Sequence, residues 1–291
     1  MKVVVFGASG TIGRPLLSEL SGEHEVVAVS RSQRRDEDGV TWKTADATDG
    51  QSVSPVLEGA DVVYYLVHSL GNPDFEERDL KAAETTAKAA DGAGVKQLVY
   101  LGGLGDDSPD LSAHLRSRRE TGKRLASTSV PVTTLHAAMV VARGSAAFET
   151  VVALVDRLPA MVTPRWVSTR TQPIALSDVV SYLTAVCGRE EAFGAAYDVG
   201  GPEVMTYRDM IERIARLREK HPLIVEVPVL TPYFSSLWLH LVTPVKAGVA
   251  RPLIEGLRNE TVARDDRIRE LAPIELTPFE TAARAALEGH A

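Results

Sequence analysis

Residues 1–13 constrain the fold more than any other part of the sequence. Val3-Val4-Val5-Phe6 is an apolar, β-branched run that predicts a buried strand, and Gly7-Ala8-Ser9-Gly10-Thr11-Ile12-Gly13 follows it directly. Arg14–Leu20 then has the spacing of a helix. A strand, a glycine-rich turn and a helix in this order are typical of the first βαβ unit of a dinucleotide-binding domain.

The glycines of this loop each have a physical reason. Gly7 permits the tight turn, Gly10 lets the backbone approach a phosphate, and Gly13 lets the helix pack closely on the strand. The helix N-terminus adds unpaired N–H groups and a partly positive end. The alternative is a tight turn that binds nothing. The cofactor contacts expected here are Gly7, Ser9, Gly10, Thr11, Ile12 and Gly13.

The rest of the first half alternates β-branched runs with helical segments. The expected strands are Glu25–Ser30, Val40–Ala45, Asp61–Val67, Lys96–Leu101 and Pro131–His136, and the expected helices are Phe75–Ala93 and Ala113–Ser127. Strands joined by helices imply right-handed crossovers and a parallel sheet covered on both faces. We therefore expect an α/β fold with a Rossmann-type, doubly wound sheet.

The second half is less regular and predicts a smaller, mixed and mainly helical substrate lobe. The expected helices are Phe148–Leu158, Ser177–Cys187 and Thr206–Lys220, with Ser177 as an N-cap, and residues from Pro228 onward are expected to be mostly helical. The expected extended segments are Gln172–Ala175, Ala196–Val199 and Leu223–Val227. We place a domain boundary at Gly144, with a dinucleotide-binding domain of residues 1–144 and a lobe of residues 145–291. Some strands of the lobe are expected to return to the main sheet.

Composition excludes several classes of function. A net charge of -7 argues against nucleic-acid binding, and the single cysteine, Cys187, excludes an internal disulfide and a cysteine-based metal cluster. We expect no metal. The chain has no apolar run of about 18 residues and no signal peptide, so the expectation is a cytoplasmic protein, as monomer or homodimer.

The residues after the second expected strand indicate which dinucleotide binds. An NAD site usually places an acidic residue there, whereas this chain has Arg31, Ser32, Arg34 and Arg35. A guanidinium at Arg31 could pair with a 2′-phosphate, so we expect NADPH or NADP+; the alternative is a solvated basic loop. Asp46 is expected either to contact the adenine edge or to cap its loop. Further cofactor contacts are expected at Ala47, Val67 and Gly102.

Five segments together resemble the NmrA-like, NAD(P)H-binding group of atypical short-chain dehydrogenases/reductases. They are residues 7–13, 64–69, 98–105, 172–179 and 198–202, and they span nearly the whole chain. The resemblance implies a Rossmann core, with parts of the second half forming a substrate lobe. It also implies that a Ser, a Tyr and a Lys four residues after the Tyr would handle the proton in most catalytic members of the wider superfamily.

The sequence departs from that relay. The strand expected to deliver the Ser ends in Gly102-Gly103, and His114 and Arg118 stand where the Tyr and Lys would be. Arg118 could hold a ribose or a phosphate but cannot release a proton, and beside it His114 should be mostly neutral and a weak acid. The alternative is a surface helix with a basic face. His68 follows the fourth expected strand, and we include it with His114 and Arg118 as a catalytic candidate; its alternative role is packing of the loop.

Substrate contacts are expected from four further residues, which are His136, Arg143, Trp166 and Trp238. His136 could equally be an interior histidine. Trp238 lies in an apolar segment, residues 230–245, which predicts core packing, a lid over an apolar substrate, a dimer surface or a shallow membrane contact.

Two functions fit these observations. The first is an NADPH-dependent reductase of a small, apolar metabolite, such as an enone, imine, quinone or carbonyl compound, and we favour it because the second lobe is complete. The second is a non-catalytic NADP(H)-binding redox sensor or assembly protein, which the missing relay favours.

Overall fold

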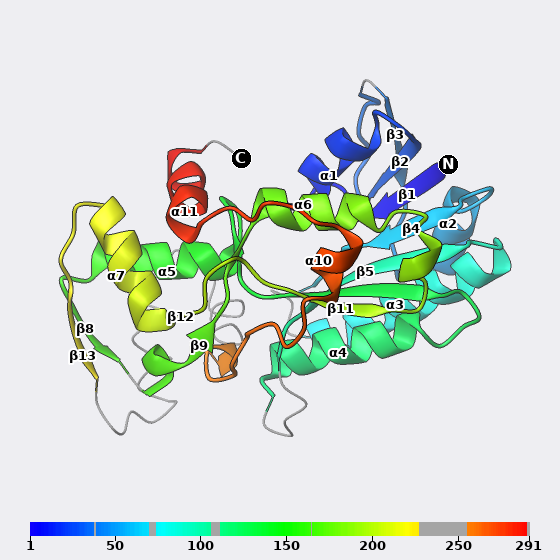
Figure 1. Cartoon of the computed structure of the whole chain (residues 1–291). Coiled ribbons are helices and arrows are strands. Elements are labelled where there is room, and N and C mark those ends of the chain that lie inside the picture. Colours follow the sequence, from blue (N-terminus) through cyan, green and yellow to red (C-terminus); the bar gives the residue numbers. More distant parts are fainter. Residues whose placement is uncertain (38, 70–73, 106–110, 164, 227–254, 290–291) are drawn as a thin grey trace.

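The computed structural model describes residues 1–289 except residues 38, 70–73, 106–110, 164 and 227–254 (Figure 1). Its centre is a seven-stranded sheet with the strand order β11-β6-β5-β4-β1-β2-β3, in which all the pairings are parallel. The strands are β1 (Lys2–Phe6), β2 (Glu25–Ser30), β3 (Val40–Thr44), β4 (Val62–Tyr65), β5 (Gln97–Gly103), β6 (Val132–Ala137) and β11 (Ala196–Val199). The edge strand β11 comes from the second half of the chain.

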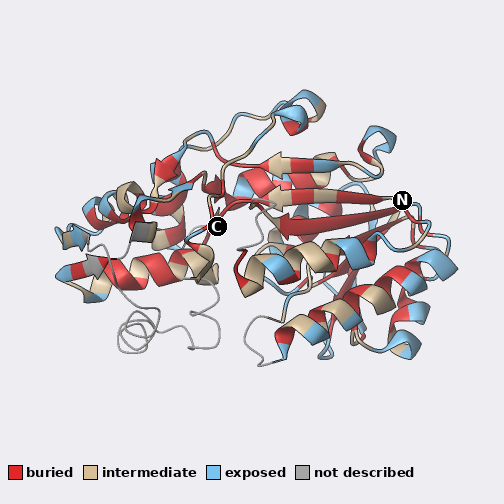
Figure 2. Ribbon diagram, turned by 90° about the horizontal axis from the view of Figure 1, so that it is seen from below, coloured by how far each residue is buried: buried red, intermediate tan, exposed pale blue. Residues whose placement is uncertain are grey.

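Helices cover both faces of this sheet, as a parallel sheet requires. One face carries α1 (Gly13–Leu20), α6 (Leu176–Ala185) and α10 (Arg267–Leu271), and the other carries α2 (Gly50–Val53), α3 (Phe75–Gly92) and α4 (Ala113–Leu125) (Figure 1). The strands are buried along most of their length, whereas the covering helices each keep an exposed side (Figure 2). The prediction of a doubly wound Rossmann-type sheet is confirmed.

The strand order reverses between β1 and β4. From β1 the chain builds β2 and β3 on one side, and then crosses to build β4, β5 and β6 on the other. The carboxyl ends of β1 and β4 therefore border a crevice that helices cannot fill, which is where ligands bind in open α/β sheets. Gly7 follows β1 and His68 follows β4, so the topology places both at this crevice.

A second layer of short elements forms the lobe. It contains α5 (Ala146–Arg157), α7 (Tyr207–Leu217) and α11 (Phe279–Glu288), which share an apolar core. Three two-stranded ladders join them: β7 (Val140–Val141) with β10 (Ile174–Ala175), β8 (Ala160–Thr163) with β13 (Leu223–Glu226), and β9 (Arg170–Thr171) with β12 (Met205–Thr206). Short 3₁₀ turns occur at Ser54–Val56, Arg165–Ser168 and Glu190–Ala192.

Three expectations for the lobe need correction. Ser177 is not an N-cap, because α6 begins at Leu176 and the Ser177 hydroxyl donates to Asp178 instead. Only Ile174–Ala175 of the expected extended segment Gln172–Ala175 forms a strand, β10; β9 ends at Thr171, and Pro173 between them has no N–H to continue a ladder. Residues 255–289 contain only α10 and α11 as α-helices of more than one turn, with extended chain between them, so the mostly helical C-terminus is wrong there; residues 227–254 lie outside the described part.

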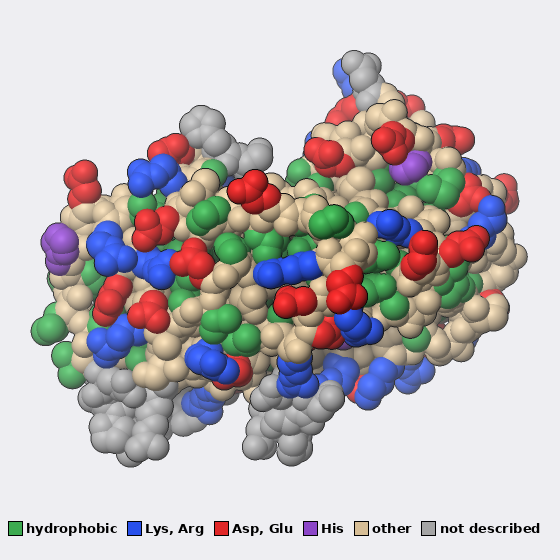
Figure 3. Space-filling model, in the orientation of Figure 1, with side chains coloured by type: hydrophobic (Ala, Val, Ile, Leu, Met, Phe, Trp, Pro, Cys, Tyr) green, Lys and Arg blue, Asp and Glu red, His purple; other side chains and the backbone are tan. Residues whose placement is uncertain are grey.

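Basic side chains gather along one edge of the molecule, over α4 (Figure 3). Arg116 lies 3.7 Å from Glu76, Arg124 lies 3.6 Å from Glu84, and Lys123 lies 2.8 Å from Glu120. The outer face of α4 is therefore a solvated basic face balanced by acids. Within the described residues, no helix is long and apolar enough to span a membrane.

Candidate active site

At two positions of the phosphate loop, Gly7 and Gly13, the backbone leaves room only for glycine. Gly7 has φ +80°, a left-handed conformation, and a Cβ there would lie 2.7 Å from the carbonyl oxygen of Leu66. A Cβ on Gly13 would lie 2.4 Å from the carbonyl oxygen of Gly7 and 2.7 Å from the Cα of Ala8. These neighbouring atoms belong to the backbone and cannot move aside, so neither glycine can be replaced by a residue with a side chain without distorting the loop.

Helix α1 begins in this loop. Its N-cap residue, Ile12, makes no side-chain capping bond, and its first turn contains no acidic residue. The Arg14 N–H donates to the Gly10 carbonyl oxygen at 3.1 Å and Pro15 has no N–H, so the helix attracts an anion mainly through its positive dipole end. The glycine cradle and this helix end together fit a dinucleotide pyrophosphate.

Arginines surround the expected adenosine end of the crevice. Arg78 lies 3.3 Å from the Asp46 carboxylate. The Thr48 backbone N–H donates to Asp46 at 2.9 Å and is the main cause of a lowered Asp46 pKa; the positive charges of Arg78 and Arg31 lower it further. Asp46 therefore caps its loop while it also holds Arg78. Arg31 is exposed and close enough to act on Asp46 electrostatically, so its guanidinium remains accessible to a ligand.

A second pair of arginines stands on the indole of buried Trp42. Arg34 lies 5.1 Å and Arg14 lies 5.4 Å from the ring centroid. Arg14 also bonds both oxygens of Glu37. Cation–π contacts of this kind fix guanidinium groups in place. The phosphate loop and the residues after β2 are thus bordered by positive charge.

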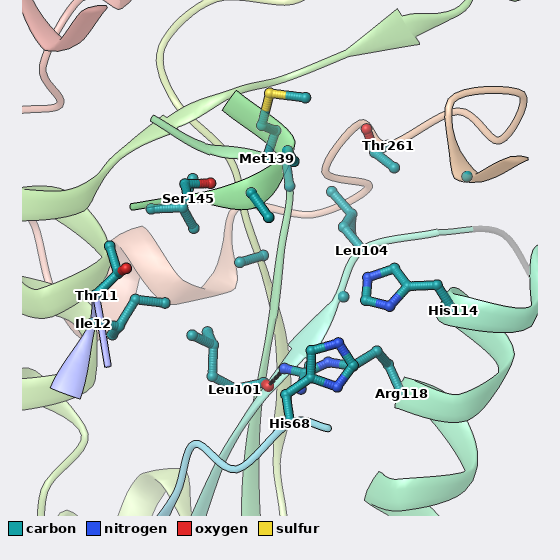
Figure 4. A pocket seen from close by; sticks show the side chains of 18 of the residues that line it. Thr11, Ile12, His68, Leu101, Leu104, His114, Arg118, Met139, Ser145 and Thr261 are labelled. Carbon is teal, nitrogen blue, oxygen red and sulfur yellow. Dashed lines mark hydrogen bonds between the residues drawn. The ribbon is translucent and has the colours of Figure 1, made fainter. Parts of the chain in front are cut away.

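A cavity of about 520 Å³ extends from the phosphate loop to α4 and the lobe. Thr11, Ile12 and Ser145 lie on one side of it, and His68, His114 and Arg118 lie on the opposite side (Figure 4). The wall between them is mostly apolar and includes Leu66, Leu101, Gly102, Leu104, Leu115, Ala137, Ala138, Met139, Val140 and Leu257. The lobe contributes Tyr207 and Thr261, so the cavity is shared by both halves of the chain.

His68 is held by a buried acid. Its Nδ1 lies 3.0 Å from the Asp79 carboxylate, and the other oxygen of Asp79 accepts from the Ser69 backbone N–H at 2.9 Å. The His68 side chain is 24% exposed, whereas that of Asp79 is 3% exposed. Removal from water lowers the pKa of His68, and the Arg118 charge lowers it further, while Asp79 acts in the opposite direction.

His114 stacks obliquely on His68, with the ring centroids 5.1 Å apart. Its Nδ1 is buried and has no hydrogen-bond partner among the described residues. Burial is the largest cause of a pKa well below 6.5 for His114, and the neighbouring His68 and Arg118 add to it. His114 is therefore a neutral imidazole at about pH 7, as the sequence predicted.

Arg118 is anchored between the sheet and α4. Its guanidinium donates to the carbonyl oxygen of Leu101 and lies 5.2 Å from the centroid of the Tyr100 ring. Tyr100 in turn donates its hydroxyl to the Arg118 carbonyl oxygen at 2.8 Å. These contacts fix a permanent positive charge beside both histidines (Figure 4).

The other expected contacts lie at different depths. Gly10 and Gly102 line the cavity, Ser9 and Ser32 are exposed, and Ala47 and Val67 pack in the core under α3. Gly10 and Gly102 thus lie where a bound cofactor can contact them, whereas Ala47 and Val67 mainly support the loops.

Those of the expected substrate residues that the structure describes are not among the residues lining this cavity. His136 lies 3.4 Å from Asp198 and lines an adjoining hollow of about 80 Å³, which shares Gly103, Leu115 and Arg118 with the cavity. Arg143 is exposed beside Gly289, and Trp166 packs edge-on against Tyr207 with centroids 6.1 Å apart. Trp238 lies outside the described residues.

Sequence reasoning missed Asp79 and the lobe residues Tyr207 and Thr261. A signal for Asp79 was present, because it occupies the buried face of α3 together with Phe75, Ala82 and Ala83. An acid on the apolar face of a helix needs a partner in the interior. Tyr207 and Thr261 carried no such signal, since only the packing of the lobe brings them to the cavity.

Residues 7–143 match the sequence model of the NAD(P)H-binding family. A (4-alkanoyl-5-oxo-2,5-dihydrofuran-3-yl)methyl phosphate reductase of Streptomyces griseus is 28% identical over 226 residues, covering 74% of this chain and 73% of that protein. An NADH dehydrogenase [ubiquinone] 1 alpha subcomplex subunit 9 of Arabidopsis thaliana is 23% identical over 239 residues, covering 77% of this chain and 60% of that protein.

A solved structure shares the fold over nearly the whole chain. The triphenylmethane reductase of Citrobacter sp., complexed with NADP(H), superimposes with a TM-score of 0.77 at 17% identity, covering 98% of this chain and 100% of that chain. The chain thus has a Rossmann-type fold, and its first half is similar to the NAD(P)H-binding family. These likenesses support its resemblance to the atypical short-chain dehydrogenases/reductases of the NmrA-like, NAD(P)H-binding group.

Proposed function

We propose that the chain is an NADPH-dependent reductase of a small, apolar metabolite with a conjugated double bond. The observation that carries this proposal is the single cavity that joins the glycine cradle to His68, His114 and Arg118 through an apolar wall. Such a cavity suits a ligand with an anionic end at the loop and a second, apolar molecule beside it.

Arg31 supports NADPH over NADH. It is exposed at the end of β2, next to the ribose position of a Rossmann site, and Arg34 is held close by on Trp42. No acidic side chain occupies the positions directly after β2, from Arg31 to Arg35. A 2′-phosphate would therefore find complementary charge, whereas a 2′-hydroxyl would find no carboxylate acceptor at these positions.

The polar groups at the far end favour a particular kind of substrate. When bound, the nicotinamide supplies a hydride. The lowered pKa values of His68 and His114 leave little of either ring protonated at about pH 7, so they give little help to an isolated alkoxide. Reduction of a double bond conjugated to a carbonyl spreads the charge over an enolate and needs less support. Arg118 places a fixed positive charge at this end of the cavity, which favours such an anion.

The Streptomyces relative supports this substrate class. The name of its substrate describes a 5-oxo-2,5-dihydrofuran ring with a 4-alkanoyl group and a methyl phosphate. The ring double bond is conjugated to two carbonyls, so the name supports the conjugated double bond, whereas the phosphate makes that substrate charged at one end. A doubly activated double bond accepts hydride with the least need for a strong acid. The apolar wall of Leu66, Leu101, Met139 and Leu257 would hold the remainder of a lipophilic substrate and keep water away.

The proposal is tested by following NADPH oxidation with enones, unsaturated lactones, quinones, imines and simple ketones. We expect steady turnover with the conjugated acceptors and at least about 100-fold lower kcat/KM with simple ketones, since these require oxyanion support. Equal rates for all acceptors would contradict the substrate class.

The cofactor assignment is tested by fluorescence titration of Arg31→Ala with NADPH and NADH. We expect NADPH to weaken about 10-fold to 100-fold, because a charge-assisted pair contributes about 1.5–3 kcal/mol, and NADH to change little. Lys88→Ala, which removes a positive charge from the exposed side of α3, should leave both affinities unchanged. Equal losses for the two cofactors would refute the 2′-phosphate role.

The second candidate function is a non-catalytic NADP(H)-binding sensor or assembly protein. It is favoured by the neutral state of His114, and the Arabidopsis relative is by name a subunit of a larger complex. Tight NADPH binding without turnover of any acceptor would support it over the reductase.

A further inference from the structure

Asp79 is a buried carboxylate that belongs neither to the phosphate loop nor to the apolar wall of the cavity. It lies on the inner face of α3 and is 2% exposed. One of its oxygens lies 3.0 Å from the Nδ1 of His68, and the other accepts from the Ser69 backbone N–H at 2.9 Å. Burying a charge is costly unless it is fully hydrogen-bonded, so these two bonds define what Asp79 does.

The pairing decides where His68 carries its proton. An ionised carboxylate only accepts hydrogen bonds, so the Nδ1 of His68 must be the protonated nitrogen of the neutral ring. The other ring nitrogen, Nε2, then carries the lone pair and is not bonded to Asp79. His68 itself lines the cavity, and its ring lies against His114 (Figure 4).

We propose that Asp79 is a positioning residue that fixes His68 as its Nδ1–H tautomer, so that Nε2 of His68 transfers the proton of the reaction. This inference rests on the proposed reductase function. In it, His68 and Asp79 do the work of the missing tyrosine and lysine, with the acid holding the ring and stabilising the imidazolium.

The charges around His68 explain why Asp79 is needed. On α4, His114 packs against the His68 ring, and the charge of Arg118 disfavours a second positive charge on His68. From α3, Asp79 is the group that favours the protonated ring. Tyr65 and Tyr100 from the sheet lie near Asp79 as well, and burial raises the pKa of each, so both remain neutral. Without Asp79, desolvation and Arg118 would disfavour protonated His68 without opposition.

The proton step balances in the direction of reduction. After hydride addition, the substrate is an enolate whose α-carbon must gain one proton. A solvent proton first binds the Nε2 lone pair of neutral His68, and Asp79 stabilises the imidazolium that forms. Its Nε2–H bond then breaks, the electron pair of that bond becomes the Nε2 lone pair again, and the carbanion pair forms the new C–H bond. Nδ1–H stays bonded to Asp79 throughout, and the next solvent proton restores Nε2–H.

The test is Asp79→Asn, compared with Glu77→Gln, which removes an exposed carboxylate from the same helix. In the asparagine variant the amide oxygen should keep the fixed Ser69 N–H, which turns the amide NH₂ toward His68. Nδ1 must then accept, and the ring should switch to the Nε2–H tautomer. The tautomer is read from the ring ¹⁵N shifts of the NADPH-bound protein, with His68→Gln used to assign the signals.

We expect the wild-type protein to show His68 protonated on Nδ1 and Asp79→Asn to show it on Nε2. The kcat for a conjugated acceptor should fall about 100-fold, a typical loss for acid–base catalysis, and the pKa in its pH profile should drop. NADPH affinity should stay within about two-fold, because Asp79 lies away from the phosphate loop. Glu77→Gln should match the wild type.

Three results would overturn the inference: Nε2–H as the wild-type tautomer, an unchanged tautomer in folded Asp79→Asn, or lower stability with an unchanged pH profile. The last would make Asp79 merely structural. If the chain reduces no acceptor, the proposed function fails and the catalytic part of the inference fails with it. The ¹⁵N shifts would still decide separately whether Asp79 fixes the tautomer.

Discussion

The two ends of the cavity are built in opposite ways. The phosphate end is one contiguous loop, Gly7–Gly13, whose backbone conformation forms the binding surface. The far end, which we propose handles the proton, consists of side chains from separate segments, with His68 after β4, Asp79 on α3, and His114 and Arg118 on α4. The first end is determined by sterics within a short segment, whereas the second depends on electrostatics between segments.

This difference predicts how substitutions at each end should change binding or proton equilibria. A side chain added to the loop meets backbone atoms that cannot move, so binding should be lost steeply. A change among the histidines and Arg118 shifts proton equilibria, so its effect should depend on pH and be graded. The predictions below test this contrast.

The largest effect is expected for Gly13→Ala. Its Cβ would lie 2.4 Å from the Gly7 carbonyl oxygen, so the loop must open and NADPH binding should weaken by more than about 100-fold. Gly22→Ala is the matched control, because no atom lies within 4 Å of a Cβ there. Fluorescence titration measures both variants. Unchanged affinity of Gly13→Ala would show that the loop is not the cofactor cradle.

A smaller, charge-based effect is expected for Arg118→Gln. The positive charge of Arg118 lowers the pKa of both His68 and His114, so removing it should raise both, by roughly one unit for a neighbouring charge. Histidine ¹⁵N titration by NMR measures the shift. Arg124→Gln, at an exposed position of the same helix, should leave both histidines unchanged. Identical titrations in the wild type and Arg118→Gln would contradict the electrostatic account of this end.

The smallest effect is expected on stability in His114→Gln. His114 has a pKa lowered well below 6.5 in the folded state, so the unfolded chain binds its proton first as the pH falls. The free energy of unfolding should therefore decrease below about pH 6.5, with a loss of about 1 kcal/mol at about pH 5.5 that the variant lacks. Urea unfolding at several pH values measures it. Parallel pH curves for the two proteins would refute burial of a neutral His114.

Sequence patterns predicted the sheet well, for a physical reason. The central strands of a buried parallel sheet are continuous apolar runs, as Val3–Phe6 is in β1. The edge strand Ala196–Val199 was also placed with the bounds that the structure shows. The lobe was harder, because its strands are two to four residues long and are paired by tertiary contacts. Ser177 shows the limit: it has the composition of an N-cap, yet α6 starts one residue earlier.

The candidate site divides along the same line. The glycine loop, Arg31, His68, His114 and Arg118 were all found from motifs at strand ends or at helical spacing. Asp79 was missed because its role depends on a hydrogen bond to His68, a residue on another element. His136 and Trp166 were expected at the substrate, but their side chains lie elsewhere, because strand and turn positions alone do not give side-chain direction.

The sequence by itself determined the α/β class, the phosphate loop and the basic character of the adenosine end, because these follow from the backbone needs of glycine and from charges near one strand. Only the tertiary structure decided which side chains share the far end of the cavity. Burial there makes the histidines neutral, Arg118 lowers their pKa values further, and Asp79 holds His68. These are effects of distance and desolvation, which exist only once α3, α4 and the sheet have packed together.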